Sequence, residues 1–317
     1  MRSLIVALTA LALAGCGGPS GGADVTFTGK DAYDFGGMAD AAPRTIEAKL
    51  YLPPGDGPVA GAAILSHGSG GTGSRQDRMA GILLEAGFAA LVVDHFGPRS
   101  IGSTVEDQLR VTAQGMMTDA FAARDLLAQH PRIPADKIGI IGWSKGGIVA
   151  SLAAVDRLAG FASDERMAFA IAFYPFCGYQ LDEETLASPL LYLIGDQDDW
   201  TPAGPCVRQA EAWAANGQPA EVVVYPGARH GFDSRAPDLT IGRAITVRDT
   251  SPRCTLTVDA AGNTVALEGG LGLETLERRR EYLEVCGVRG VGFGGNSDAR
   301  AASTDKVLGF IRAALAD

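Results

Sequence analysis

The stretch Ile138–Ile148 (IGIIGWSKGGI) has the local pattern of a β-strand that turns abruptly into a helix. Gly142 and Gly146 flank Ser144 at the two positions where such a turn leaves no room for side chains. The pattern G-x-S-x-G between a strand and a helix predicts a nucleophile elbow, with Ser144 exposed at the carboxyl edge of a sheet. The alternative is a glycine-rich turn whose serine only caps the helix.

In an elbow of this kind, the residue after the serine begins the helix. The backbone N–H of Lys145 would therefore lie at a helix N-terminus, where negative charge is favoured. We interpret this N–H as a candidate oxyanion donor. The Lys145 side chain is expected to point away from Ser144, which argues against a Ser-Lys dyad.

Residues 1–16 have the pattern of an export signal. Arg2 precedes the apolar run Leu4–Leu13, which is too short for a comfortable membrane span, and LAGC at 13–16 resembles the lipobox of bacterial lipoproteins. The pattern predicts a signal peptide over 1–15, lipid on Cys16 and a flexible tether over 16–24. We expect an exported protein anchored in a bacterial membrane, on the periplasmic side of the outer membrane. The alternative is an ordinary secretory signal with a chance cysteine.

The composition suits one large globular domain, expected over residues 25–317. Hydrophobic residues make up 46% of the chain, and its net charge of −10 argues against nucleic acid as a partner. No second segment is long and apolar enough to span a membrane.

The cysteines indicate disulfides. The chain has five, and four remain once Cys16 is set aside for lipid. In an oxidising compartment these four can form two bonds, for which the sequence alone allows three connectivities. We favour Cys177–Cys206, because both would follow neighbouring strands at one sheet edge, and Cys254–Cys286, which would close a separate late segment.

Short apolar strands alternate with helices along most of the chain, which predicts a parallel sheet covered on both faces. Ligands of such sheets bind beyond the carboxyl ends of the strands. Strands are expected at 25–28, 45–51, 62–65, 89–93, 137–141, 168–173, 190–194 and 221–225, and helices at 75–86, 106–129, 147–156, 202–215 and 304–315.

Residues 233–303 interrupt this alternation. They predict a hairpin with strands at 255–258 and 264–267, a charged helix over 273–285 and a glycine-rich stretch at 287–295. We interpret them as an insertion beside the active site rather than as a domain, since loops of this length are commonly lids or binding surfaces.

A serine nucleophile needs a base, and the chain has only four histidines. His230 follows the last core strand and precedes a glycine that lets its loop approach the nucleophile, which makes it the candidate base. We expect His67 to pack and hydrogen-bond near its strand end, and His130 to lie at the surface. His95, in another strand-end loop, is a candidate for the pocket wall.

The base needs a carboxylate to hold its tautomer. Asp196, Asp198 and Asp199 follow a strand, and Thr201-Pro202 has the pattern of a helix N-cap and first helical residue. The aspartates thus lie in the connecting loop, where the acid is expected, and we prefer Asp198. Asp199 could instead support the helix start, and Asp196 could close the turn.

Three motifs and the order of the candidate residues resemble dienelactone hydrolases of the α/β-hydrolase superfamily. The motifs are GWSKGG at 142–147, GDQDDWTP at 195–202 and YPGARHGF at 225–232. The resemblance covers roughly residues 45–232 and the final helix. It implies an α/β-hydrolase fold, with a mostly parallel central sheet and helices on both faces. We expect neither a cofactor nor a metal.

The resemblance also implies roles for single residues. Ser144, Asp198 and His230 would form the triad, and the N–H of Ser69, with that of Gly70 as second choice, would join Lys145 in the oxyanion hole. The namesake enzymes have cysteine at the elbow, whereas this chain has serine, which suggests an ordinary ester. Typical members also lack the insertion. The expected activity is that of a serine hydrolase that cleaves small carboxylic esters through an acyl-enzyme.

Two other function classes remain as alternatives. Residues 68–73 fit G-x-G-x-x-G, with Asp94 where a ribose-binding acid belongs, as in a dinucleotide-binding oxidoreductase. Export would remove the protein from the cytoplasmic nicotinamide pool. The other alternative is a non-catalytic ligand-binding lipoprotein, against which the intact candidate triad argues. No His, Cys or carboxylate cluster has metal-ligand spacing.

Overall fold

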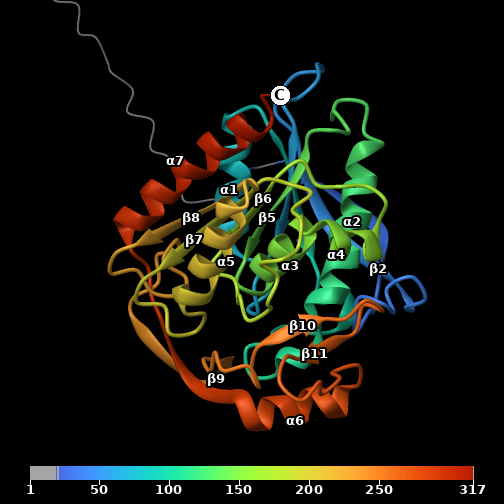
Figure 1. Cartoon of the computed structure of the whole chain (residues 1–317). Helices are drawn as coiled ribbons and strands as arrows, with labels where there is room; N and C mark the ends of the chain where they lie inside the picture. Colours follow the sequence, from blue (N-terminus) through green and yellow to red (C-terminus); the bar gives the residue numbers. More distant parts are fainter. Residues whose placement is uncertain (1–18, 20, 317) are drawn as a thin grey trace, which may run out of the picture.

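A computed structural model describes residues 19 and 21–316. Its centre is an eight-stranded sheet with the order β1-β2-β4-β3-β5-β6-β7-β8 (Figure 1). The pairs β1–β2 and β2–β4 are antiparallel, and the pairs from β4–β3 to β7–β8 are parallel. The strands are β1 (Ala23–Lys30), β2 (Pro43–Tyr51), β3 (Ala62–Ser66), β4 (Ala89–Asp94), β5 (Ile138–Trp143), β6 (Ala170–Phe173), β7 (Leu190–Gly195) and β8 (Ala220–Tyr225).

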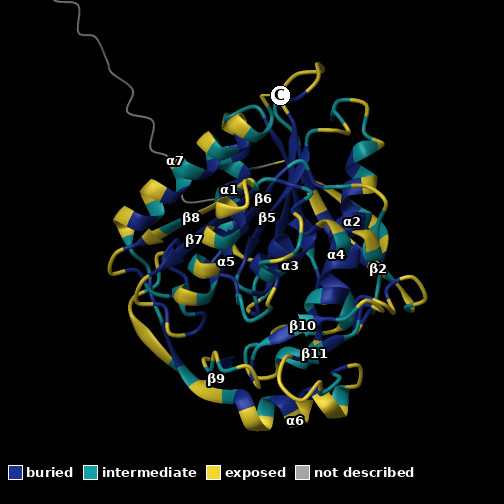
Figure 2. Cartoon of the chain, viewed as in Figure 1, coloured by how far each residue is buried: buried dark blue, intermediate teal, exposed yellow. Residues whose placement is uncertain are grey.

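Helices cover both faces of this sheet, as the apolar strand pattern predicts. One face packs against α1 (Ser74–Glu85) and α7 (Ser297–Ala314). The other packs against α2 (Ala113–Ala128), α3 (Lys145–Ala154), α4 (Asp156–Ala162) and α5 (Ala203–Ala215). Figure 2 shows the central strands buried between these two layers. The predicted α/β fold class is therefore confirmed.

The two helices whose starts differ most from the prediction are capped by side chains at the residues where they begin. The helix expected over 106–129 begins at Ala113, since the Thr112 hydroxyl accepts the N–H of Gly115 at 3.0 Å. Asp107 caps a separate 3₁₀ turn, η2 (Gln108–Arg110). The closing helix begins at Ser297 rather than at 304, because the Asn296 side chain caps its first turn.

The N-terminal predictions fall mostly outside the described residues. The signal peptide over 1–15 and Cys16 belong to the undescribed part, so export and lipidation stay predictions. The tether prediction is wrong at its end, because Ala23 and Asp24 pair with Leu50 and Lys49 in the sheet. Among the described residues, no helix has the length and apolar character needed to cross a bilayer.

The insertion folds into its own small elements at one end of the molecule (Figure 1). The predicted hairpin is present as β10 (Leu256–Val258) and β11 (Thr264–Ala266), and the charged helix is α6 (Leu276–Cys286). An antiparallel ribbon of β9 (Leu239–Val247) and β12 (Gly287–Phe293) was not predicted. Each strand finds its partner only across the rest of the insertion, so local sequence patterns do not reveal the pair.

Both predicted cysteine pairs are bonded in the structure. Cys177–Cys206 joins the segment after β6 to the first turns of α5. Cys254–Cys286 joins the segment before β10 to the end of α6. Each bond therefore ties a loop to a helix.

Candidate active site

Ser144 lies between the end of β5 and the start of α3, in a backbone conformation with φ 52° and ψ −111°. A positive φ outside glycine costs about 1–3 kcal/mol and persists only where the surrounding structure enforces it. The flanking glycines are required sterically: a Cβ on Gly142 would lie 1.9 Å from the Gly146 carbonyl oxygen, and one on Gly146 would lie 2.1 Å from that of Ser66. This is the geometry of the predicted elbow.

An unbroken chain of hydrogen bonds joins the three candidate triad residues. Ser144 Oγ lies 3.0 Å from His230 Nε2, and His230 Nδ1 lies 2.8 Å from Asp198 Oδ2. A carboxylate only accepts, so we assign the His230 proton to Nδ1. Nε2 is then free to accept the proton of the serine hydroxyl. The structure thus brings together three residues that the sequence separates widely.

Asp198 is the one of the three neighbouring aspartates that reaches the histidine. Its Oδ1 accepts the backbone N–H groups of Trp200 and Thr201 at 2.9 and 2.8 Å, which fixes the carboxylate plane. Asp196 instead accepts a hydrogen bond from the N–H of Gly227 at 2.7 Å, so its side chain links its own loop to the loop after β8. The Asp199 side chain accepts a hydrogen bond from the N–H of Gly292 and pairs with Arg248, so it does not support the helix start.

Thr201 has a role that the sequence did not predict. Its hydroxyl lies 3.1 Å from both Asp198 Oδ2 and His230 Nδ1, and 3.0 Å from the Tyr174 carbonyl oxygen. The predicted N-cap role is wrong, because Pro202 is the cap of α5. Nothing in the local pattern distinguishes a capping threonine from one turned toward the triad.

The histidine is also held by packing. The rings of Tyr174 and Trp200 lie against His230, with centroids 4.5 and 4.6 Å from its ring. Buried Asp233 accepts hydrogen bonds from Tyr174 Oη at 2.6 Å and from Trp143 Nε1 at 2.9 Å. Asp233 therefore ties the histidine loop to the residue before Ser144, a link without any sequence signal.

The two predicted oxyanion donors border the same cavity as Ser144. Ser69 follows β3, and Lys145 begins α3. Within the described residues, neither backbone N–H has a hydrogen-bond partner. A Cβ on Gly68, the residue before Ser69, would lie 3.1 Å from Ser144 Cβ, so the loop after β3 packs directly against the candidate nucleophile. Both N–H groups are thus available to a ligand bound at Ser144.

The Lys145 side chain points away from the nucleophile, as expected. Its Nζ donates to the carbonyl oxygens of Gln108 and Val111, both at 2.6 Å. Burial lowers the pKa of Lys145 to about 7. The side chain therefore fastens the segment before α2 over the cavity instead of acting on Ser144.

The cavity in front of Ser144 has a volume of about 170 Å³. Its walls are mostly apolar. Side chains from the core domain supply one part, and side chains from the insertion supply the other: Leu109, Ala113, Ile148, Phe176 and Trp200 against Ile245, Val247, Leu256, Leu273 and Leu283. The insertion thus completes the cavity, as expected for a binding surface.

The other proposed binding features have structural roles. Asp94, the candidate ribose ligand, accepts the N–H groups of Phe96 and Gly97 at 3.0 and 2.9 Å and so shapes a turn. No group of three or more His, Cys, Asp or Glu residues in the described part of the chain could hold a metal ion.

Residues 46–251 match the dienelactone hydrolase family, which is well over half of the chain. The chain belongs to the dienelactone hydrolase family. Its hydrolase fold and the Ser-His-Asp geometry agree with this membership. The match ends within the insertion, so all of the residues from β10 to β12 lie beyond the matched part.

Similar proteins include an enzyme named "Probable 2-oxo-3-(5-oxofuran-2-ylidene)propanoate lactonase" from a Bradyrhizobium species, which is 27% identical over 173 residues. That match covers 49% of this chain and 66% of the relative. Among solved structures, butyrate-bound Est2, an esterase of Thermogutta terrifontis, is 19% identical with a TM-score of 0.49, covering 59% of this chain and 80% of its own. The same enzyme phosphoramylated by tabun is 20% identical with a TM-score of 0.48, covering 59% and 80%.

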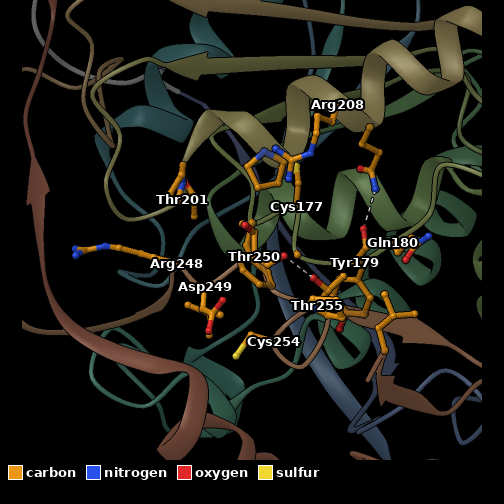
Figure 3. A pocket seen from close by; sticks show the side chains of 18 of the residues that line it. Cys177, Tyr179, Gln180, Thr201, Arg208, Arg248, Asp249, Thr250, Cys254 and Thr255 are labelled. Carbon is orange, nitrogen blue, oxygen red and sulfur yellow. Dashed lines mark hydrogen bonds between the residues drawn. The ribbon is translucent and has the colours of Figure 1, made fainter. Parts of the chain in front are cut away.

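A second, larger cavity of about 330 Å³ adjoins the first in this member of the dienelactone hydrolase family. Figure 3 shows its side chains, with Arg208 from α5 on one side and Arg248 and Asp249 from the insertion on the other. The two cavities share Phe176, Tyr179, Thr201 and Val247 as walls. Thr201, one of these shared residues, also contacts Asp198 and His230.

Removing the insertion disulfide is expected to destabilise the protein and to weaken substrate binding. The bond Cys254–Cys286 closes a separation of 32 residues, and such a bond contributes about 3–4 kcal/mol in the chain-entropy model. A Cys254→Ser/Cys286→Ser variant should lose about 2–4 kcal/mol of unfolding free energy in urea. Its KM should rise, because the insertion forms the cavity wall.

The Cys177→Ser/Cys206→Ser variant is the comparison for this experiment, because its bond closes a similar separation of 29 residues outside the insertion. It should lose similar stability with a smaller change in KM. An unchanged unfolding free energy and an unchanged KM in the first variant would contradict the role of the bond.

Proposed function

We propose that the protein is a serine hydrolase that cleaves carboxylic esters through an acyl-enzyme on Ser144. The observation that supports this most directly is the hydrogen-bond chain from Asp198 through His230 to Ser144, which ends at a mostly apolar cavity. Membership of a hydrolase family supports the same reaction class. The serine takes the place of the cysteine expected from the family's namesake enzymes.

In the proposed reaction, Ser144 Oγ attacks the ester carbonyl carbon while His230 Nε2 takes the hydroxyl proton. Asp198 holds the imidazole and stabilises the imidazolium. The carbonyl oxygen, now an oxyanion, accepts hydrogen bonds from the N–H groups of Ser69 and Lys145. The imidazolium then protonates the leaving alcohol, and water attacks the acyl-enzyme by the same steps and releases the acid.

The cavity supports a preference for short acyl groups. Its volume of about 170 Å³ is smaller than the roughly 300–1,000 Å³ of pockets for drug-sized ligands. A lactone is a cyclic ester and would meet the same groups. Lactones therefore belong in the substrate panel beside linear esters.

A fluorophosphonate probe and an ester panel test this function. The probe should modify Ser144, as located by peptide mapping, because phosphonylation needs the activated hydroxyl. The specificity constant kcat/KM should be highest for short acyl esters and should fall as the chain outgrows the cavity. If the purified protein is not labelled and turns over none of the esters or lactones, the proposal is wrong.

We also propose that the protein is exported and anchored in the outer membrane through lipid on Cys16. The support is the lipobox-like sequence LAGC at 13–16. Membrane fractionation of the wild type and of Cys16→Ser tests the anchor. If lipid on Cys16 holds the protein, the variant should be released into the soluble fraction. Equal membrane association of the two proteins would contradict it.

A further inference from the structure

A second Ser-His-Asp chain lies in the core beside the first. Ser66 Oγ lies 3.0 Å from His95 Nε2, and His95 Nδ1 lies 2.8 Å from Asp119 Oδ2. All three residues are fully buried, and none lines either cavity next to Ser144. The expectation that His95 borders the pocket is therefore wrong. No substrate reaches Ser66, so this chain of hydrogen bonds has another use.

The second chain is anchored by an arginine whose side chain is only 7% exposed. Arg99 binds both Asp119 oxygens, at 2.7 and 3.1 Å, and its Nη1 donates to the His95 carbonyl oxygen at 2.8 Å. Arg99 Nε donates to Asp31 at 2.8 Å. Because the Asp119 carboxylate is paired with Arg99, it accepts a hydrogen bond from His95 Nδ1–H. His95 Nε2 in turn accepts a hydrogen bond from the Ser66 hydroxyl. His95 is thus held through its ring and its main chain.

His95 in turn fixes His67. The His95 backbone N–H donates to His67 Nε2 at 3.1 Å, which places the His67 proton on Nδ1. That Nδ1–H donates to the Gly68 carbonyl oxygen at 2.8 Å. Burial lowers the pKa of His67 to about 3, so the ring stays neutral and keeps this tautomer at working pH.

The Gly68 carbonyl and the Ser69 N–H belong to one peptide unit. A trans peptide is planar, so the two groups point in opposite directions. The oxygen is held by His67 and by the N–H of Gly71 at 3.1 Å, and the Ser69 N–H must then face the other way. Ser69 borders the Ser144 cavity on that loop.

We infer that His67 is a positioning residue that orients the Ser69 N–H in the oxyanion hole through its hydrogen bond to the Gly68 carbonyl oxygen. The inference rests on the proposed esterase function. It assigns the buried Ser66-His95-Asp119 chain the task of holding His67 in its Nδ1–H tautomer. A peptide that turns away from this orientation would lose one of two donors to the developing oxyanion.

Two substitutions of His67 distinguish the effect of its hydrogen bond to Gly68 from the effect of having any polar side chain at this position. His67→Asn retains an N–H near the Nδ1 position and so retains the donor to Gly68. His67→Gln places its amide near the Nε2 position, where it satisfies the His95 N–H but leaves the Gly68 oxygen without this donor. Both variants lose the imidazole ring, so its packing against Phe96 is removed in each.

The readouts are kcat and KM for the best ester of the panel, the affinity for a trifluoromethyl ketone of matching chain length, and Tm. The Ser144 hydroxyl adds to that ketone, its proton passes to His230, and the ketone oxygen becomes an oxyanion. His67→Gln should lose about 10²-fold in kcat, with KM changed less than about threefold. Its affinity for the ketone should fall by the same factor as kcat, and His67→Asn should recover most of both losses.

Other outcomes overturn the inference. The inference is wrong if kcat falls equally in the two variants. It is also wrong if His67→Gln changes only KM, or if its affinity for the ketone is unchanged. His130→Gln, a similar change in the turn after α2, is the control and should match the wild type. If His67→Gln does not fold, His67→Asn decides alone, because a 10²-fold loss there contradicts a role that its donor preserves.

A failure of the proposed esterase function would give different results from a failure of this inference. A wild-type protein that is neither labelled by the phosphonate nor active on the panel refutes the function and the inference that rests on it. An active, labelled wild type with indistinguishable asparagine and glutamine variants refutes the inference alone.

Discussion

Replacing Ser144 with alanine is expected to lower kcat by about 10⁴–10⁶-fold and to abolish phosphonate labelling. His230→Ala should have a similar effect, because the hydroxyl is a weak nucleophile without the base that lies 3.0 Å away. The double variant should lose no more than either single variant, since the residues act as a unit. Steady-state kinetics with the best ester of the panel, together with Tm, measures these effects.

Ser151→Ala is a matched control for the serine substitution. Ser151 is a buried serine in α3, the helix that follows Ser144, and its hydroxyl donates to the Gly147 carbonyl oxygen at 2.9 Å. Its loss should leave kcat and labelling unchanged. Turnover that survives Ser144→Ala, or labelling at another residue, would refute the assignment of the nucleophile.

Asp198→Asn is expected to lower kcat by about 10⁴-fold with a small change in Tm. An asparagine can donate its amide hydrogen to His230 Nδ1, which stabilises the tautomer with the proton on Nε2. That nitrogen could then no longer accept the Ser144 proton. The backbone N–H groups of Trp200 and Thr201 would still bind the side-chain oxygen, so the loop should keep its shape.

The neighbouring aspartates provide the controls for this prediction. Asp199 accepts the N–H of Gly292 at 2.6 Å and pairs with Arg248, and Asp196 accepts the N–H of Gly227 at 2.7 Å. Neither contacts His230, so Asp196→Asn and Asp199→Asn should change kcat by no more than a few fold. A larger loss in either one than in Asp198→Asn would show that another carboxylate orients the base.

The elbow could be predicted because all of its requirements are local. Gly142 and Gly146 are needed within one turn of the chain, and the apolar strand and the small-residue helix adjoin them. The residues of the candidate triad could be predicted for a related reason. In an alternating β/α chain, loops that follow parallel strands meet at one sheet edge, so His230 and Asp198 were expected near Ser144.

The same reasoning about sheet edges led to the pair Cys177–Cys206, and the pair Cys254–Cys286 was expected because it closes a separate late segment. Reasoning of this kind failed where no such rule applies. The hydrogen-bond partners of Thr201 and Asp233 come from the end of β5, the segment after β6 and the loop of His230. The ribbon of β9 and β12 pairs the two ends of the insertion. Contacts of this kind depend on how elements pack, which no local pattern records.

His67 and His95 show most clearly the difference between what the sequence alone determined and what only the tertiary structure decided. The sequence alone determined the fold class, the elbow and the residues of the candidate triad, because strand order and glycine spacing act over short distances or through a general rule of sheet topology. Only the tertiary structure decided which hydroxyls, carboxylates and peptide groups the two buried histidines would contact. Those contacts join β3, β4 and α2, and burial removes the competing water that would otherwise satisfy the same polar groups.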